Sequence, residues 1–269
     1  MNGICHHHPD FSSRLVAPRN VDIWLPPGYS ANHPNRYPVL YFHDGQNLFE
    51  PHLSYIGVDW EIDEAMLRLV AEGKIRQTIV VGIWNTPRRV REYTPAKAIH
   101  QFAPPEEAER FHQEIGGGLL SDEYLKFIVQ ELKPFVDACY PTLPGPADTF
   151  LMGSSLGGLI SLYGLCEYPG VFSGAGCVST HWPIGDGCMI EYMKQALPSP
   201  QGHRIYFDFG TGNLDAAYEP FQARADEVME QAGYTYGQNW ITRKFEGAEH
   251  SERAWRERAH IPLEFLLHP

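Results

Sequence analysis

This sequence of 269 residues lacks long apolar stretches, an uninterrupted run of basic residues and internal repeats. Its longest apolar stretches, such as residues 78–84, are far shorter than the roughly 20 residues that a membrane-spanning helix needs. The amino terminus also lacks the charged and then apolar layout of a secretory signal. Taken as given, the sequence predicts a cytoplasmic protein without a membrane-spanning segment.

Positive charge is scarce as well. The chain has 21 Lys and Arg against 33 Asp and Glu, a net charge of −12 with His neutral. A surface of this sign repels phosphate backbones and anionic membranes, so we expect no nucleic-acid partner and no membrane partner. Aromatic residues make up 13% and apolar residues 43% of the chain, which excludes a largely disordered protein.

Cysteine pairs with the spacing of metal or redox sites are also absent. The five cysteines include no Cys-x-x-Cys pair, and a chain of this size folds without disulfides, so free thiols are expected. His6, His7 and His8 are adjacent, but neighbouring histidines on a flexible chain end lack a fixed ligand geometry. A surface or processing segment is the favoured interpretation, and we predict neither a metal site nor a cofactor.

What the sequence does contain is a regular alternation of strand and helix patterns. Apolar, β-branched runs predict strands at residues 21–25, 38–42, 78–84, 149–152, 174–179 and 204–209, with a weaker one at 240–245. Several are apolar throughout, as strands covered on both faces are. Helical patterns follow Asp59, Ser155 and Asp215, and others cover residues 121–136 and the carboxyl terminus. Pro134 predicts a kink or break in the pattern at 121–136.

This alternation predicts a single domain over residues 1–269: an α/β three-layer sandwich with a mostly parallel central sheet and helices on both faces. Residues 88–118 fit the pattern poorly, because they are polar and interrupted by Pro104, Pro105 and Gly116–Gly118. An inserted cap or a loop that borders the substrate is expected there.

The most specific motif is Gly-x-Ser-x-Gly at residues 153–157, placed between the strand at 149–152 and the helix that follows Ser155. A serine on such a tight turn projects from the backbone, and the glycines leave room for the turn to close. The alternative is a plain Gly/Ser turn, but the strand–turn–helix context favours Ser155 as a nucleophile. The backbone N–H of Leu156 is then available to an oxyanion.

A serine nucleophile needs a histidine base, and in this class of fold the acid lies between the two in the chain. His250 lies in a predicted turn between the last strand pattern and the final helix. Asp215 lies in the loop after strand 204–209 and is the favoured acid. Asp208, inside that strand, is its rival, and Glu249 or no acid at all are further alternatives.

A second oxyanion donor is expected where the strand at 38–42 ends in a turn. The chain resembles the putative-esterase branch of the α/β-hydrolase superfamily, which includes enterochelin, feruloyl and acetyl-xylan esterases. The segments that carry the resemblance span nearly the whole chain and are residues 24–29, 43–49, 59–60, 85 with 91–95, 153–158, 210–215 and 247–252.

The resemblance implies Ser155 as nucleophile, His250 as base and Asp215 as acid, with the backbone N–H groups of Gln46 and Leu156 as the oxyanion hole. It also implies that residues 88–118 border the substrate. The expected activity is that of a serine carboxylesterase acting on a small-molecule or oligosaccharide-linked ester, such as a feruloyl, acetyl-sugar or siderophore ester. An acyltransferase and a catalytically silent binding protein are the alternatives.

Three more residues are candidates for substrate binding. His181 and Trp182 follow the strand at 174–179, and they either line an acyl pocket or cover the rim of the core. Arg89 lies in an arginine cluster beside Asn85, and it either holds an anionic group of the substrate or forms an ion pair with Glu92. The oligomeric state is not predicted.

Overall fold

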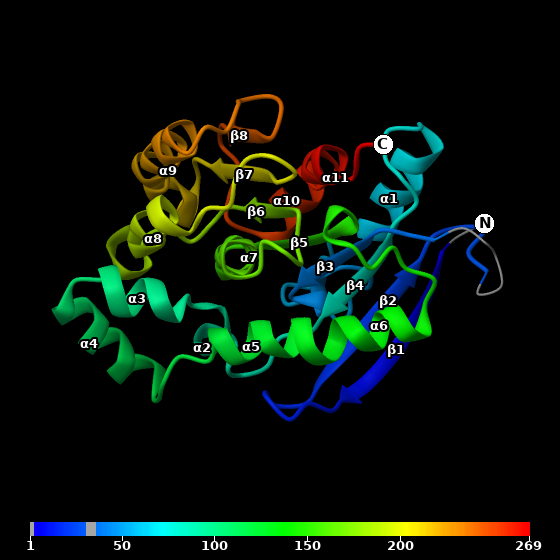
Figure 1. The fold of residues 1–269 in the computed structure, drawn as a ribbon, viewed down its shortest axis with the longest axis horizontal. Coiled ribbons are helices and arrows are strands. Elements are labelled where there is room, and N and C mark those ends of the chain that lie inside the picture. The colour runs from blue at the N-terminus through cyan, green and yellow to red at the C-terminus, as the bar shows by residue number, and fades with distance from the viewer. Residues whose placement is uncertain (1–2, 31–35) are drawn as a thin grey trace.

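An eight-stranded sheet runs through the computed structural model, which describes residues 3–30 and 36–269 (Figure 1). The strand order is β1-β2-β4-β3-β5-β6-β7-β8. β2 pairs antiparallel with β1 and with β4, and the remaining neighbours are parallel. The strands are β1 (Ile4–Phe11), β2 (Arg19–Leu25), β3 (Val39–His43), β4 (Ile79–Ile83), β5 (Thr149–Ser154), β6 (Gly174–Val178), β7 (Arg204–Gly210) and β8 (Trp240–Phe245).

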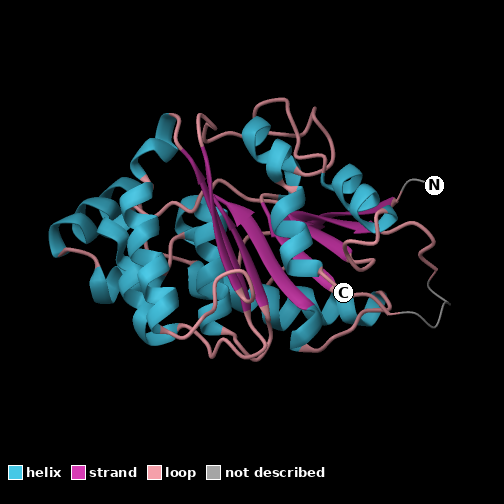
Figure 2. Cartoon of the chain, turned by 90° about the horizontal axis from the view of Figure 1, so that it is seen from above, coloured by secondary structure: helices cyan, strands magenta, loops and turns pink. Residues whose placement is uncertain are grey.

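Helices cover both faces of the sheet, which Figure 2 shows edge-on between them. α1 (Ile62–Ala71), α10 (Glu252–Arg258) and α11 (His260–Leu267) lie on one face. The other face is covered by α5 (Ser121–Phe127), η2 (Ile128–Leu132), α6 (Lys133–Cys139), α7 (Leu156–Glu167), α8 (Cys188–Ala196) and α9 (Glu219–Gln231). Short 3-10 turns are η1 (Gly45–Asn47), η3 (Pro146–Asp148), η4 (Ile184–Gly187) and η5 (Asn213–Ala217).

The central strands are largely apolar because each contributes to two cores. In β3, Val39 and Tyr41 pack on the α7 side, whereas Leu40 and Phe42 pack on the α1 side. Successive side chains of a strand point to opposite faces, so a strand covered on both faces has few polar positions. The predicted three-layer α/β sandwich with a mostly parallel sheet is confirmed.

Near Pro134, where a kink or break was predicted, the chain stays helical but changes its type of helix. α5 passes into one π-helical turn, η2, before α6 begins with Pro134 in its first turn. Pro134 has no N–H to donate to the carbonyl four residues earlier, so a regular α-helix would lose a hydrogen bond there, and the wider π-helical turn accommodates the proline.

Residues 88–118 form helices rather than an irregular loop. They contain α2 (Arg89–Tyr93), α3 (Ala96–Phe102) and α4 (Pro105–Ile115), and α3 packs against α8. Pro104 and Pro105 mark the start of α4, and Gly116 ends it in a left-handed conformation. The prolines and glycines that suggested a loop therefore act as helix boundaries.

β1 was not predicted, and the expectation of a flexible amino-terminal segment at His6–His8 is wrong. The strand pairs with β2 along Ile4–Phe11 and forms the edge of the sheet. An edge strand has only one neighbour and stays largely exposed, so it needs no apolar pattern. The signal that reveals the central strands is therefore missing from its sequence.

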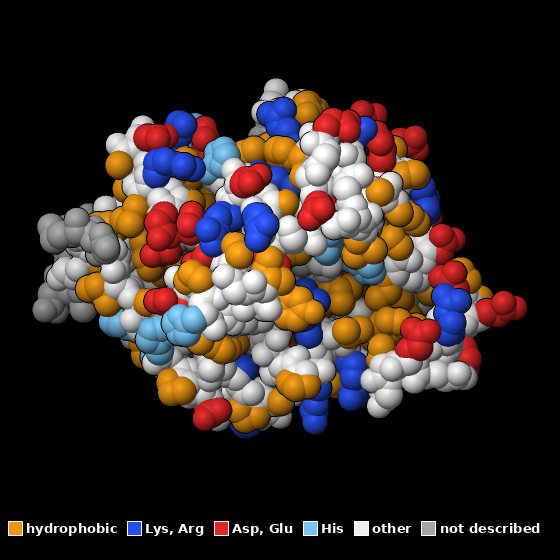
Figure 3. Space-filling view, turned by 180° about the vertical axis from the view of Figure 1, so that it is seen from behind, with side chains coloured by type: hydrophobic (Ala, Val, Ile, Leu, Met, Phe, Trp, Pro, Cys, Tyr) orange, Lys and Arg blue, Asp and Glu red, His pale blue; other side chains and the backbone are white. Residues whose placement is uncertain are grey.

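Neither a membrane span nor a disulfide is found in the described residues. None of the helices in residues 3–30 and 36–269 combines the length and the apolar character that a bilayer crossing needs. All five cysteines are free thiols. On the face shown in Figure 3, Lys and Arg side chains lie among Asp and Glu and do not gather into one basic patch.

Candidate active site

Ser155 lies on a sharp turn between the end of β5 and the start of α7. Its backbone has φ 58° and ψ −123°, a combination that residues with a side chain rarely adopt. A Cβ on Gly153 would lie 2.7 Å from the carbonyl carbon of Gly157, so strand and helix approach each other at a point where only glycine fits. This is the geometry of a nucleophile elbow.

The backbone N–H groups of Leu156 and Gln46 are the candidate hydrogen-bond donors to an oxyanion near this turn. Leu156 is the first residue of α7, so its N–H has no acceptor within the helix. Gln46 lies in η1, directly after the end of β3, and its side-chain Oε1 accepts a hydrogen bond of 3.2 Å from the backbone N–H of Asn85. Both residues come from turns at the carboxyl ends of adjacent strands.

His250 is oriented by Asp215. The Nδ1 of His250 lies 2.5 Å from Oδ1 of Asp215. The other carboxylate oxygen of Asp215 accepts hydrogen bonds from the Ser179 hydroxyl at 2.6 Å and from the Gly210 N–H at 2.7 Å. Burial alone raises the pKa of Asp215, but these hydrogen bonds outweigh it and hold the pKa below its ordinary value.

The Ser179 hydroxyl is itself saturated with partners. It accepts hydrogen bonds from the indole N–H of Trp255 at 3.0 Å and from Arg258 at 2.8 Å. A hydroxyl has one proton to donate and two lone pairs. Both lone pairs are occupied, so the proton can only be donated to Asp215.

Asp208 occupies a different position. It is fully buried and accepts hydrogen bonds from the Ser179 N–H at 3.0 Å and the Tyr206 hydroxyl at 2.8 Å. It also forms an ion pair of 3.1 Å with Arg258. Glu249 is exposed. Of the three candidate acids, Asp215 is the one that contacts His250.

Ser155 and His250 line one cavity of about 650 Å³. Among the described residues, no hydrogen bond joins the two side chains. Such bonds are often long in a free enzyme and tighten when substrate binds. The wall of the cavity comprises Asp44, Gln46, Asn47, Leu53, Tyr55, Ile56, Asn85, Thr86, Pro87, Arg89, Ser154, Ser155, His250, Ser251, Glu252 and Trp255.

Arg89 lines this cavity, but its positive charge is neutralised by an ion pair with Asp44. The guanidinium donates two hydrogen bonds to the Asp44 carboxylate, at 2.7 and 2.8 Å. Burial raises the pKa of Asp44, and Arg89 more than compensates and holds it below its usual value. Glu92, the predicted partner, instead pairs with Arg19 in the core at 2.7 Å.

His181 and Trp182 do not line the cavity. Trp182 is 1% exposed, and its indole N–H donates to Gln222 at 2.9 Å. His181 lies 2.7 Å from the hydroxyl of Tyr218, and burial lowers its pKa to about 4. The structure therefore favours the interpretation that these two residues cover the rim of the core over the interpretation that they line an acyl pocket.

Several cavity residues were not predicted. Leu53, Tyr55 and Ile56 are exposed hydrophobic residues in the connection between η1 and α1, and large exposed apolar side chains often mark binding surfaces. Glu252 is 7% exposed, and burial raises its pKa. Its side chain accepts a hydrogen bond from Asn47 at 3.5 Å. No local sequence signal distinguishes Glu252 from an ordinary acid in the first turn of a helix.

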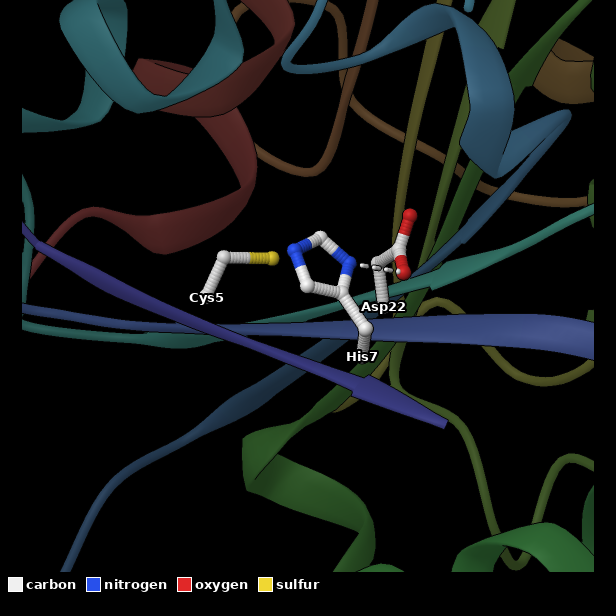
Figure 4. Close-up of side chains that lie close together, drawn as sticks. All are labelled: Cys5, His7 and Asp22. Carbon is white, nitrogen blue, oxygen red and sulfur yellow. Dashed lines mark hydrogen bonds and ion pairs between the residues drawn. The ribbon is translucent and has the colours of Figure 1, made fainter. Parts of the chain in front are cut away.

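Metal-ligating side chains gather outside this cavity. In residues 3–30 and 36–269, the side chains whose ligand atoms lie close enough together to hold a metal ion are Cys5 and His7 of β1 and Asp22 of β2 (Figure 4). It includes neither Ser155 nor His250.

The chain matches the family described as "Putative esterase" over residues 12–260. It is 27% identical over 200 residues to the uncharacterized protein YbbA of Bacillus subtilis strain 168, a match that covers 74% of this chain and 71% of YbbA. YjcH of the same bacterium is 28% identical over 214 residues, which cover 80% of this chain and 75% of YjcH.

Solved structures with the same fold include a ferulic acid esterase, with a TM-score of 0.71, 17% identity and 99% coverage of both chains. The enterobactin esterase FES of Shigella flexneri has a TM-score of 0.67 and 19% identity, and the match covers 99% of this chain and 59% of FES. A ferulic acid esterase of Anaeromyces mucronatus has a TM-score of 0.66 and 19% identity, and the match covers 99% of this chain and 90% of that esterase. The protein thus has the α/β-hydrolase fold and belongs to the Putative esterase family.

Proposed function

We propose that this protein is a serine carboxylesterase that forms an acyl-enzyme on Ser155. One observation carries the proposal: Ser155 on its strained turn and His250, bonded to Asp215, line the same cavity. Neither the Ser155 turn nor the His250–Asp215 pair alone would support the proposal, because Gly-x-Ser-x-Gly turns and His–Asp pairs also occur in proteins that are not enzymes.

The reaction starts at the ester carbonyl. The N–H at Nδ1 of His250 donates a hydrogen bond to Asp215. Nε2 therefore carries the lone pair and accepts the proton of the Ser155 hydroxyl. The serine oxygen bonds to the carbonyl carbon, and the carbonyl oxygen becomes an oxyanion. The backbone N–H groups of Leu156 and Gln46 donate to this oxyanion, and each such donor is worth roughly 3–4 kcal/mol.

Collapse of this intermediate releases the alcohol. The bond between the carbonyl carbon and the alcohol oxygen breaks, and the imidazolium of His250 gives its proton to the leaving oxygen. A water molecule, deprotonated by His250, then attacks the acyl-enzyme. The second collapse releases the carboxylic acid and restores the Ser155 hydroxyl.

The cavity wall favours a substrate with an apolar part. Leu53, Tyr55 and Ile56 form one side of the cavity and are partly open to solvent. The neighbours with this fold are esterases named for ferulic acid and enterobactin. We include aryl and aryl-acyl esters in the proposed substrate range for this reason.

The test compares wild type with Ser155→Ala on an aryl acetate, methyl ferulate, acetylated xylan and a catecholate siderophore. We expect hydrolysis of at least the aryl acetate by wild type, and a loss of about 10⁴-fold or more in the variant. Ser161→Ala is the matched control, because this serine lies in α7 and its hydroxyl bonds to the Gly157 carbonyl. A fluorophosphonate should label Ser155, and full activity of Ser155→Ala would refute the proposal.

A further inference from the structure

The pleat of β1 divides the three consecutive histidines between the two faces of the sheet. The side chains of His6 and His8 lie 3.1 and 3.0 Å from the Tyr140 hydroxyl. His7 points to the opposite face, because successive residues of a strand alternate. Cys5 lies two residues before His7 and shares its face. The sequence Cys-x-His on a strand therefore brings a thiol and an imidazole together.

The neighbouring strand adds a carboxylate to the same face. Asp22 of β2 is paired directly with His7 in the antiparallel register, so both side chains point the same way. The sulfur of Cys5, a ring nitrogen of His7 and a carboxylate oxygen of Asp22 all lie within 4.8 Å of one another. Nδ1 of His7 is 2.8 Å from Oδ1 of Asp22.

The orientation of the imidazole matches that of a metal ligand. Figure 4 shows the ring of His7 between the other two side chains, with one nitrogen toward Asp22 and the other toward the thiol of Cys5. Metal-binding histidines usually donate one ring N–H to a carboxylate while the other nitrogen binds the ion. Asp22 fulfils that orienting role here, and its second oxygen is fixed by the indole N–H of Trp84 at 2.6 Å.

The charges around Cys5 are negative. Burial and the charges of Asp22, Asp63 and Glu50 raise the pKa of the Cys5 thiol to about 12. A bound divalent cation reverses this effect, because a coordinating thiol loses its proton. Asp22 is only 4% exposed, and His7 and Trp84 are the side chains that hydrogen-bond to it among the described residues.

A small cavity adjoins these groups. Its volume is about 20 Å³, and Glu50 is among its lining residues with Cys5, His7 and Asp22. A space of this size holds a single water molecule or ion. The side chain of His7 is 63% exposed, so an ion can enter from solvent.

We propose that Cys5 and His7 bind a transition-metal ion of the zinc class, with Asp22 orienting the imidazole and Glu50 facing the open side. Thiolate and imidazole together select Zn²⁺ and its analogue Co²⁺ over Mg²⁺ or Ca²⁺. Coordination breaks the S–H bond of Cys5 and releases its proton to solvent. Gln46 also lines the small cavity, so the ion would lie beside the turn that carries this residue.

The proposal is tested with untagged protein stripped of metal by a chelator and then titrated with Co²⁺. Coordination by a thiolate produces a sulfur-to-cobalt charge-transfer band in the near ultraviolet. We expect this band to saturate at one Co²⁺ per chain in wild type and to be lost in Cys5→Ser. Cys139→Ser is the matched control, because Cys139 is an exposed free thiol outside the group, and it should keep the band.

Two histidine variants separate this site from a nonspecific histidine surface. His7→Gln changes an exposed side chain and is expected to fold, which circular dichroism checks, and to lose the band. His6→Gln, on the opposite face, should keep it. Asp22→Asn should weaken Co²⁺ binding about 10–100-fold. The absence of a band in folded wild type, its survival in Cys5→Ser, or its loss in His6→Gln but not in His7→Gln would each overturn the proposal.

Discussion

Replacement of Asp215 by asparagine is expected to lower kcat by about 10⁴-fold, or roughly 5 kcal/mol, because it puts the proton on the wrong nitrogen of His250. The argument follows from the donors around residue 215. The Gly210 N–H is a fixed donor at 2.7 Å from Oδ2. The Ser179 hydroxyl must also donate to that oxygen, because Trp255 and Arg258 occupy both of its lone pairs.

An asparagine at this position must therefore place its single oxygen at the site of Oδ2. Its NH₂ group then faces Nδ1 of His250 and can only donate. Nδ1 becomes the acceptor, and Nε2 carries the proton. In that tautomer the imidazole cannot accept the proton of Ser155, although the positions of all side chains are almost unchanged.

The assay is steady-state hydrolysis of an activated aryl ester, with the active-site concentration determined by fluorophosphonate labelling of wild type. Asp208→Asn is the informative comparison. It removes the negative charge of the closer of the two carboxylates that pair with Arg258 in the core, so we expect a loss of about 3–5 kcal/mol in unfolding free energy. The kcat per folded molecule should stay near that of wild type. An Asp215→Asn enzyme within tenfold of wild type, or a folded Asp208→Asn enzyme slower by 10⁴-fold, would refute this reasoning.

Three further predictions concern charge, packing and pH. Glu252→Gln should raise kcat/KM for an anionic aryl ester about tenfold relative to a matched neutral ester, because a buried carboxylate at the cavity wall repels substrate anions; an unchanged ratio would contradict this. Gly153→Ala should lower the free energy of unfolding by about 1–3 kcal/mol, measured by urea denaturation, because its Cβ meets the backbone of Gly157. The depressed pKa of Asp215 contributes stability above the ordinary pKa of 3.8, and this contribution is lost as the pH falls toward the folded value. Urea midpoints measured from pH 6 to pH 3 should therefore decline less steeply in Asp215→Asn than in wild type; parallel curves would contradict this assignment.

The sequence predicts those parts of the fold in which local pattern and burial agree. β3 and β4 are recognisable because both faces are buried, so nearly every position is apolar. β1 is not recognisable, since it pairs with β2 at the edge of the sheet and most of its side chains are exposed. In residues 88–118, α4 buries no residue, and the composition of such a polar surface helix resembles that of a loop. α2 and α3 do bury side chains, but each has at most seven residues, too few to show a helical period clearly.

The same distinction applies to the site. Ser155 is predictable because the chemistry and the backbone geometry of the turn lie within five consecutive residues. The choice between Asp215 and Asp208 is not local, because it depends on which carboxylate the fold brings to His250. The environment of Trp182 likewise depends on the packing of α9, which places Gln222 within hydrogen-bond distance.

The hydroxyl of Ser179 connects two parts of the molecule that are far apart in the sequence. Trp255 and Arg258 both belong to α10, and both donate hydrogen bonds to this oxygen atom, which in turn donates to Asp215. A shift of α10 across the sheet would therefore displace the carboxylate without any change in the loop that carries it. Substitutions that loosen the packing of α10 should therefore slow the reaction before they unfold the chain. Screens for variants with reduced activity should recover such substitutions at positions that do not contact the substrate.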